Sequence, residues 1–121
     1  MRAKVVTDHP GEGTFPTFKQ GTPVTMDTDE DTDFPGWYAC KIEGYATYVP
    51  VVFVRDSALT RDYNPTELAQ VAGDMLDVNG IVNAWLIATN EQGTTGWIPA
   101  ACVVSVKLPY PPRQGRSRYL A

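Results

Sequence analysis

The chain contains two copies of one residue pattern, and this internal repeat constrains its fold more than any other feature. In each copy a glycine, Gly21 or Gly73, is followed three and five positions later by apolar side chains, an alternation typical of a β-strand. A polar loop then leads to a tryptophan, Trp37 or Trp85, and onward to a proline and a hydrophobic finish. We therefore expect two copies of one small unit.

The same register extends through the rest of each copy. Residues 5–9 (VVTDH) align with residues 59–63 (LTRDY), and a valine stands four residues after each of the two prolines. Ten glycines and ten prolines lie between short β-branched and aromatic runs, which indicates many strands joined by tight turns. The expected strands lie near residues 3–7, 22–27, 36–43, 46–50 and 52–55 in the first copy, and near 58–61, 74–79, 84–90, 94–98 and 101–105 in the second.

A unit of this length with five strands has one economical fold, a small sheet that closes on itself as a partly open barrel. Such barrels bury only about 60% of the unfolded surface, so each gains stability by packing against the other. The join at residues 54–59 contains no flexible spacer. We therefore expect an all-β chain with two closely packed five-stranded barrels in tandem, over residues 1–56 and 57–106, and an extended C-terminal tail over residues 107–121.

Charge is divided unevenly along the chain. Residues 1–105 hold fourteen acidic and six basic residues, a net charge of −8, whereas residues 106–121 hold four basic and no acidic residues. An acidic body repels phosphate, so nucleic acid is not an expected partner of the folded part. No apolar run approaches the roughly 20 residues that cross a bilayer, and the N-terminus has no signal-peptide apolar region. We expect a cytoplasmic protein with no membrane partner.

Residues that carry chemistry are few. His9 is the only histidine, and with it the two cysteines, Cys40 and Cys102, cannot complete a four-ligand zinc site. The cysteines are expected to be buried free thiols, with a disulfide between the copies as the alternative. The sequence has no phosphate-binding glycine loop and no nucleophile beside a base. It therefore predicts neither an enzyme nor a bound cofactor or metal.

Four motifs of the second copy occur in the order and at the spacing of SH3 domains: LTRDY at residues 59–63, ELAQVAGD at 67–74, NAWLIAT at 83–89 and GTTGWIPAACV at 93–103. The first copy resembles the same family less closely, through VVTDH at 5–9, FKQGTPV at 18–24, GWYACKIEG at 36–44 and YVPVVFV at 48–54. The likeness covers about residues 3–105. The chain thus resembles a tandem pair of SH3 domains, and this resemblance implies the barrel fold.

In the SH3 family a shallow aromatic groove binds proline-rich segments in the polyproline II conformation. The resemblance implies eight peptide-binding residues: Tyr63, Glu67, Trp85 and Pro99 in the second copy, and His9, Trp37, Pro50 and Phe53 in the first. Among these, Glu67 would pair with a cation of the ligand. Each copy departs from the family at two tyrosine positions, which hold Arg61 and Cys102 in the second copy and Thr7 and His9 in the first.

The three tryptophans are expected to differ in role. Trp37 and Trp85 follow a polar loop and precede an alternating strand, which favours rings on the outer face, with a place in the core as the alternative. Trp97 is assigned to packing or to the interface between the units. The resulting hypothesis is a non-catalytic adaptor that binds proline-rich or extended peptides. The alternative is a structural or oligomerising SH3-like protein that has lost peptide binding.

Two charged segments have open interpretations. The tail contains a Pro-x-x-Pro segment with a following cation, and Pro109, Pro112 and Arg113 are candidate residues of an internal ligand. A flexible tether raises the local concentration to roughly millimolar, enough for docking within one chain or in a swapped dimer, whereas a terminus that touches nothing is the alternative. The acidic loop at residues 27–33 (DTDEDTD) is either a solvated loop or an attraction for a cation near Trp37.

Overall fold

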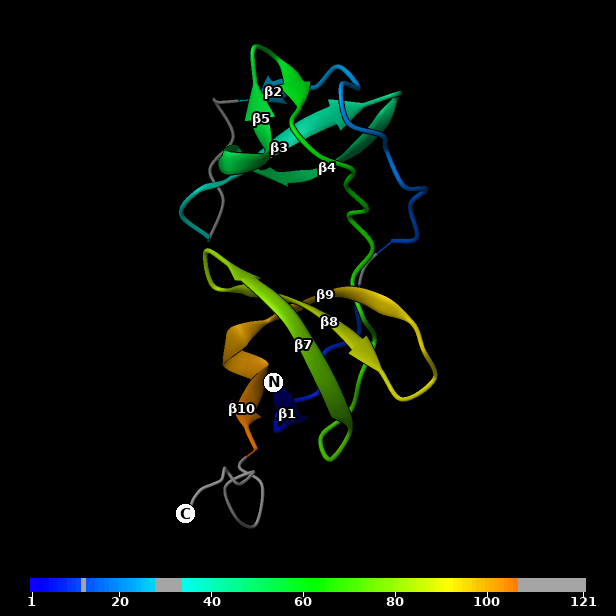
Figure 1. Ribbon diagram of the computed structural model, residues 1–121, viewed down its shortest axis with the longest axis vertical. Helices are drawn as coiled ribbons and strands as arrows, with labels where there is room; N and C mark the ends of the chain where they lie inside the picture. Colours follow the sequence, from blue (N-terminus) through cyan, green and yellow to red (C-terminus); the bar gives the residue numbers. More distant parts are fainter. Residues whose placement is uncertain (12, 28–33, 107–121) are drawn as a thin grey trace, which may run out of the picture.

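The computed structural model describes residues 1–11, 13–27 and 34–106, and these fold into two lobes stacked along the long axis of the molecule (Figure 1). Within these ranges the regular elements are β-strands and two one-turn 3-10 helices, so the all-β prediction is confirmed. No helix in the described part has the length and apolar character to cross a membrane. The tail residues Pro109, Pro112 and Arg113, and the acidic loop beyond Asp27, lie outside the described residues.

The upper lobe in Figure 1 contains a three-stranded antiparallel sheet in the order β2 (Thr25–Asp27), β3 (Trp37–Ile42) and β4 (Tyr45–Pro50). The 3-10 helix η1 (Val51–Phe53) follows β4 directly and leads into a two-stranded hairpin of β5 (Val54–Arg55) and β6 (Ala58–Leu59). The hairpin turn has positive φ at both Asp56 and Ser57, as a type I′ hairpin turn requires. The join between the halves of the sequence is therefore a tight turn.

The lower lobe contains a five-stranded antiparallel sheet in the order β10 (Val103–Ser105), β1 (Arg2–Val5), β7 (Met75–Val82), β8 (Trp85–Asn90) and β9 (Thr95–Pro99). The 3-10 helix η2 (Ala100–Cys102) precedes β10. The strands thus form open sheets of five, three and two strands, whereas the sequence predicted two five-stranded barrels.

The first strand of each half pairs within the lobe of the other half, which corrects the expected strand assignment. β1 was expected beside the strands of residues 1–56, but Ala3 pairs with Leu76 of β7, and β1 also pairs with β10. Conversely, β6 pairs with β5, and Ala58 forms a bridge to Pro23 in the upper lobe. Short apolar strands of this kind fit either sheet, so the sequence pattern did not distinguish the two arrangements.

The described chain crosses from one lobe to the other twice, first along residues 6–11 and 13–22 and then along residues 60–74, and we call these the two crossing segments (Figure 1). The crossing segments run antiparallel and are bonded to each other. Two pairs of residues exchange backbone N–H···O hydrogen bonds of 2.8 or 2.9 Å between them: Phe18 with Tyr63, and His9 with Gln70. The lobes are therefore joined by two bonded straps rather than by one linker.

Asp8 and Asp62, which occupy equivalent positions in the two copies of the repeat, form equivalent hydrogen bonds between the crossing segments. The Asp8 carboxylate accepts a 2.8 Å hydrogen bond from the backbone N–H of Ala72, and the Asp62 carboxylate accepts one of the same length from Gln20. Each aspartate thus bonds the turn of the opposite crossing segment. Exposed hydrogen bonds to a charged group contribute about 1 kcal/mol or somewhat more each.

The buried side chains form two clusters, one for each lobe. The upper cluster includes Phe18, Ile42 and Val49, and the lower cluster includes Val5 and Leu76; all of these are at most 1% exposed. Val5 comes from the N-terminal strand, so its burial in the lower cluster follows from the strand exchange. Burying a side chain of this size contributes about 1.5–3 kcal/mol.

Trp97 links the two clusters. It lies on β9 of the lower sheet, yet its ring belongs to the upper cluster, 5.2 Å from the ring of Trp37 between centroids. The preceding residue, Gly96, lets a crossing segment approach, because a Cβ at this position would stand 2.9 Å from the carbonyl oxygen of Thr66. The assignment of Trp97 to packing between the units is confirmed.

The cysteines are both free. Cys40 is buried in the upper lobe, and burial raises the pKa of its thiol to about 11. Cys102 is partly buried at the end of η2, and burial raises its pKa as well. The alternative of a disulfide between the halves is therefore wrong.

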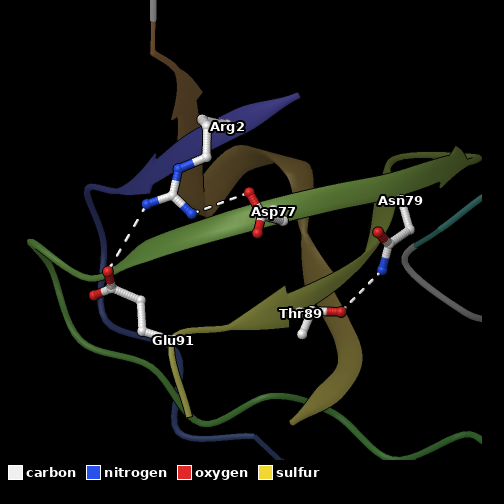
Figure 2. Close-up of polar contacts among 5 residues, drawn as sticks. All are labelled: Arg2, Asp77, Asn79, Thr89 and Glu91. Carbon is white, nitrogen blue, oxygen red and sulfur yellow. Dashed lines mark hydrogen bonds and ion pairs between the residues drawn. The ribbon is translucent and has the colours of Figure 1, made fainter. Parts of the chain in front are cut away.

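The outer face of the lower sheet carries exposed polar side chains (Figure 2). The Arg2 guanidinium lies 3.0 Å from the Asp77 carboxylate and 3.8 Å from that of Glu91. On the same sheet, the Asn79 side-chain amide donates a 3.0 Å hydrogen bond to the Thr89 hydroxyl. Exposed pairs of this kind contribute about 1 kcal/mol or less, so these contacts add little to the stability of the sheet.

Candidate binding pocket

A pocket of about 530 Å³ lies where the two lobes and the crossing segments meet. Its lining includes six of the eight binding residues expected from the sequence: His9, Trp37, Tyr63, Glu67, Trp85 and Pro99. The sequence assigned these residues to two separate grooves. The structure brings them together in one pocket.

The two central tryptophans are placed by equivalent strand pairings. Trp37 begins β3 opposite Pro50, and Trp85 begins β8 opposite Pro99. The two rings lie 5.9 Å apart between centroids and are tilted by 51°. The Trp37 indole N–H donates a 3.1 Å hydrogen bond to the carbonyl oxygen of Asn83, in the turn between β7 and β8. The lobes therefore touch at their tryptophans.

The strand exchange determines which aromatic rings meet. His9 of the first half, which the SH3 resemblance aligned with a tyrosine, lies edge-on to Trp85 of the second half, with centroids 5.8 Å apart. Reciprocally, Tyr63 of the second half lies 5.6 Å from the Phe53 ring of the first half. Both of these ring contacts therefore join a side chain of the first half to one of the second half.

The expectation that both central indoles face outward is wrong for Trp37. Its ring packs between Trp85 and Trp97 and is only 7% exposed. Trp85 is half-buried, against His9 and Phe34. The polar loop before Trp37 indicated an exposed position, but the lower lobe covers the ring. Trp37 therefore lines the pocket as a buried wall.

Two expected binding residues do not line the pocket. Pro50 is fully buried beside Trp37, and Phe53 is 5% exposed within the upper cluster. The Arg61 guanidinium lies 4.5 Å from the centre of the Phe53 ring, a cation–π contact at a position where the SH3 resemblance implied a tyrosine. This part of the implied groove is closed by the chain's own side chains.

An acidic group and a histidine connect the crossing segments at the pocket. Glu67 Oε1 and His9 Nε2 form a 2.9 Å hydrogen bond, and their side chains are 21% and 16% exposed. The Tyr63 hydroxyl donates a 2.6 Å hydrogen bond to the carbonyl oxygen of Tyr48. Burial raises the pKa of Tyr63 well above its usual range, and the nearby Cys40 and Glu67 raise it further. Tyr63 therefore remains a neutral donor.

Sequence reasoning missed several residues of the lining, among them Pro10, Phe34, Tyr48, Pro65 and Trp97. Trp97 was recognised as a packing residue because it occupies an apolar position of the SH3-like motif. The others lie beside recognised residues, but only the relative position of the lobes turns them toward one space. No local pattern in the sequence encodes that placement.

Comparison with protein-family models, with curated proteins and with solved structures finds no match to this chain. Within the described residues, no group of three histidine, cysteine, aspartate or glutamate side chains is arranged to hold a metal ion. The aromatic pocket is therefore the feature on which a function can be based.

Proposed function

We propose that this chain is a non-catalytic binding protein, built from a duplicated SH3-like unit whose halves exchange their first strands, and that the shared pocket holds an extended, proline-rich segment of a partner protein. The observation that carries this proposal is the convergence of six expected binding residues from both halves on one pocket. Residues that are distant in the sequence and unrelated in role would not be expected to meet in one pocket by chance.

Equivalent turns beside each tryptophan support the SH3-like assignment. In the upper lobe, the N–H of Val51 at the start of η1 donates a 2.7 Å hydrogen bond to the carbonyl oxygen of Gly36. In the lower lobe, the N–H of Ala100 at the start of η2 donates a 2.8 Å hydrogen bond to that of Ala84. A tryptophan and its cross-strand proline thus recur in both halves, in the order that the SH3 resemblance implies for the two residues, and a 3-10 turn follows the proline each time.

A proline-rich segment suits this pocket because it is already extended and rigid before binding, which lowers the entropy cost of ordering it. The volume of about 530 Å³ lies within the range of ordinary ligand sites, about 300–1,000 Å³. Burial of an aromatic side chain contributes about 1.5–3 kcal/mol, so contact with Trp85, Tyr48 and Phe34 corresponds to binding between about millimolar and micromolar before ordering costs, which weaken it. Glu67 would pair with a basic residue of the peptide.

The test is a titration of the full chain with a proline-rich peptide that carries one arginine, followed by nuclear magnetic resonance. We expect the indole signals of Trp37 and Trp85 to shift together, and Trp85→Ala to lose the response. Ile81→Ala is the matched control, because Ile81 is 62% exposed and lies outside the pocket lining. A folded protein that forms a stable oligomer in light scattering, and shows no shift with any such peptide, would support the structural alternative instead.

The C-terminal tail is proposed as an internal competitor for the same pocket, because its Pro-x-x-Pro segment and net positive charge match the ligand that the pocket would bind. Truncation after Val106 is then expected to perturb the signals of Tyr63 and Trp85 and to strengthen binding of the added peptide. Unchanged spectra and unchanged affinity would show that the tail does not occupy the pocket.

A further inference from the structure

The aromatic rings of the pocket are steeply inclined to one another. Trp85 forms angles of 70° with Phe34, 78° with His9 and 51° with Trp37, and Trp37 forms an angle of 86° with Trp97. None of these four ring pairs is parallel, so none of them forms a slot in which a flat ligand would be sandwiched between two rings. Rings at these angles instead form the corners of a box, which suits a rounded ligand group that contacts several ring faces at once.

The polar atoms of the buried rings are turned to the protein backbone. Each donates to a carbonyl oxygen: Trp37 Nε1 to Asn83 at 3.1 Å, Trp97 Nε1 to Asn64 at 3.0 Å, and the Tyr63 hydroxyl to Tyr48 at 2.6 Å. These contacts fix the orientation of the rings. Because Trp37, Trp97 and Tyr63 are at most 7% exposed, the half-buried rings of Trp85 and Phe34 are the electron-rich surfaces that a ligand meets.

Glu67 is the one acidic side chain among the described residues that line the pocket. Glu67 carries a carboxylate at the pocket wall, held by its hydrogen bond to His9. A cation therefore suits the site, but the kind of cation matters. An unmodified ammonium has three N–H donors that must keep hydrogen-bond partners, and it loses strong hydration on entry. A methylated ammonium keeps its charge, is weakly hydrated and presents a rounded apolar surface to the rings.

We propose that the pocket recognises a methylated ammonium group, supplied either by a trimethyl-lysine of the bound segment or by a free quaternary ammonium compound. The inference rests on the proposed function in using the same pocket as the ligand site. Trp85 and Phe34 contact the methyl groups, and Glu67 supplies the opposite charge. The prolines of the bound segment then contact the other residues of the pocket and add to the affinity.

The experiment uses the full chain and two small probes of nearly the same shape, observed through the Trp85 indole signal. Choline is the charged probe, and the neutral control is the alcohol in which a tert-butyl group replaces the trimethylammonium group. We expect choline to bind at least about tenfold more tightly than the neutral alcohol, since the negative faces of the neutral rings and the Glu67 carboxylate attract only the charged probe. Equal affinity for the two probes would overturn the inference.

Peptide arms identify the source of the group. A proline-rich peptide with trimethyl-lysine is expected to bind about tenfold more tightly than the same peptide with unmodified lysine; if choline alone binds as tightly as the trimethylated peptide, the free compound is the source. Equal binding of the two peptides would contradict the proposal. Glu67→Gln preserves the side-chain shape and is expected to weaken choline binding several-fold while leaving the neutral alcohol unchanged. This variant keeps the test decisive if Trp85→Ala fails to fold.

The outcomes also separate this inference from the proposed function. Suppose that a proline-rich peptide without a methylated ammonium group shifts the Trp85 signal and that choline does not. This result would support the proposed function and contradict recognition of a methylated ammonium group. No response to any peptide or to choline would remove both.

Discussion

Replacement of Val5 by alanine tests the strand exchange directly, because Val5 belongs to the first half of the sequence but is buried in the lower lobe. Its side chain is 0% exposed among Leu76 and Ile98. The substitution removes two methyl groups, worth about 0.8 kcal/mol each in transfer free energy, and leaves a cavity. We therefore expect a loss of about 2–3 kcal/mol in the free energy of unfolding, measured by urea denaturation.

Leu59→Ala is the reciprocal variant, since Leu59 belongs to the second half and is 3% exposed in the upper cluster with Val24. Its expected cost is about 2–5 kcal/mol. The location of the change is read from methyl signals by nuclear magnetic resonance. Val5→Ala should shift Leu76 and Ile98, and Leu59→Ala should shift Val24. The reverse pattern, with Val5→Ala perturbing the upper lobe, would refute the exchanged arrangement, as would a loss below about 0.5 kcal/mol for either variant.

Three further predictions concern packing and titration. Gly96→Ala should lower the free energy of unfolding, measured by urea denaturation, by about 1–3 kcal/mol, because the added Cβ meets a backbone oxygen at 2.9 Å. Gly80→Ala should lower it less, because the nearest neighbour there is a side-chain methyl at 3.3 Å. Equal effects of the two substitutions would contradict the close approach at Gly96. At about pH 8 a thiol reagent should label Cys102 first, since only roughly a thousandth of the Cys40 thiol is ionised at a pKa of about 11, and labelling in the opposite order would contradict its burial. The folded state holds the protons of Cys40 and Tyr63 to higher pH than the unfolded state, so the free energy of unfolding should fall as pH rises above about 9; Tyr63→Phe should lessen this fall, and a flat profile would contradict the raised pKa values.

The parts of the fold that depend on local pattern were predictable from the sequence. Alternation and turn residues located the hairpins that begin at Trp37 and Trp85. The 3-10 helices η1 and η2 were not predicted, because strands were expected over residues 52–55 and 101–105. The tight connection at residues 54–59 was also expected to hold the halves close, and it is a two-residue hairpin turn. These features follow from interactions between neighbours in the sequence.

The exchange of β1 and β6 could not be predicted in the same way. Val5 presents the same apolar side chain to either sheet, and the local pattern does not encode which partner it finds. The same limit applies to the pocket. Six of its residues were identified, but as members of two grooves, and the burial of Trp37 depends on contact with the other lobe. The strand exchange and the shared pocket depend on contacts between residues that are distant in the sequence, whereas the repeat shows only which residues of the two halves are equivalent.

The stoichiometry of peptide binding tests the central claim most directly. If the halves exchange their first strands and form one shared pocket, calorimetric titration of the full chain with a proline-rich peptide should give one peptide per chain, and Trp85→Ala should abolish all binding. Two independent peptides per chain, with one retained in Trp85→Ala, would show two separate grooves and contradict the account.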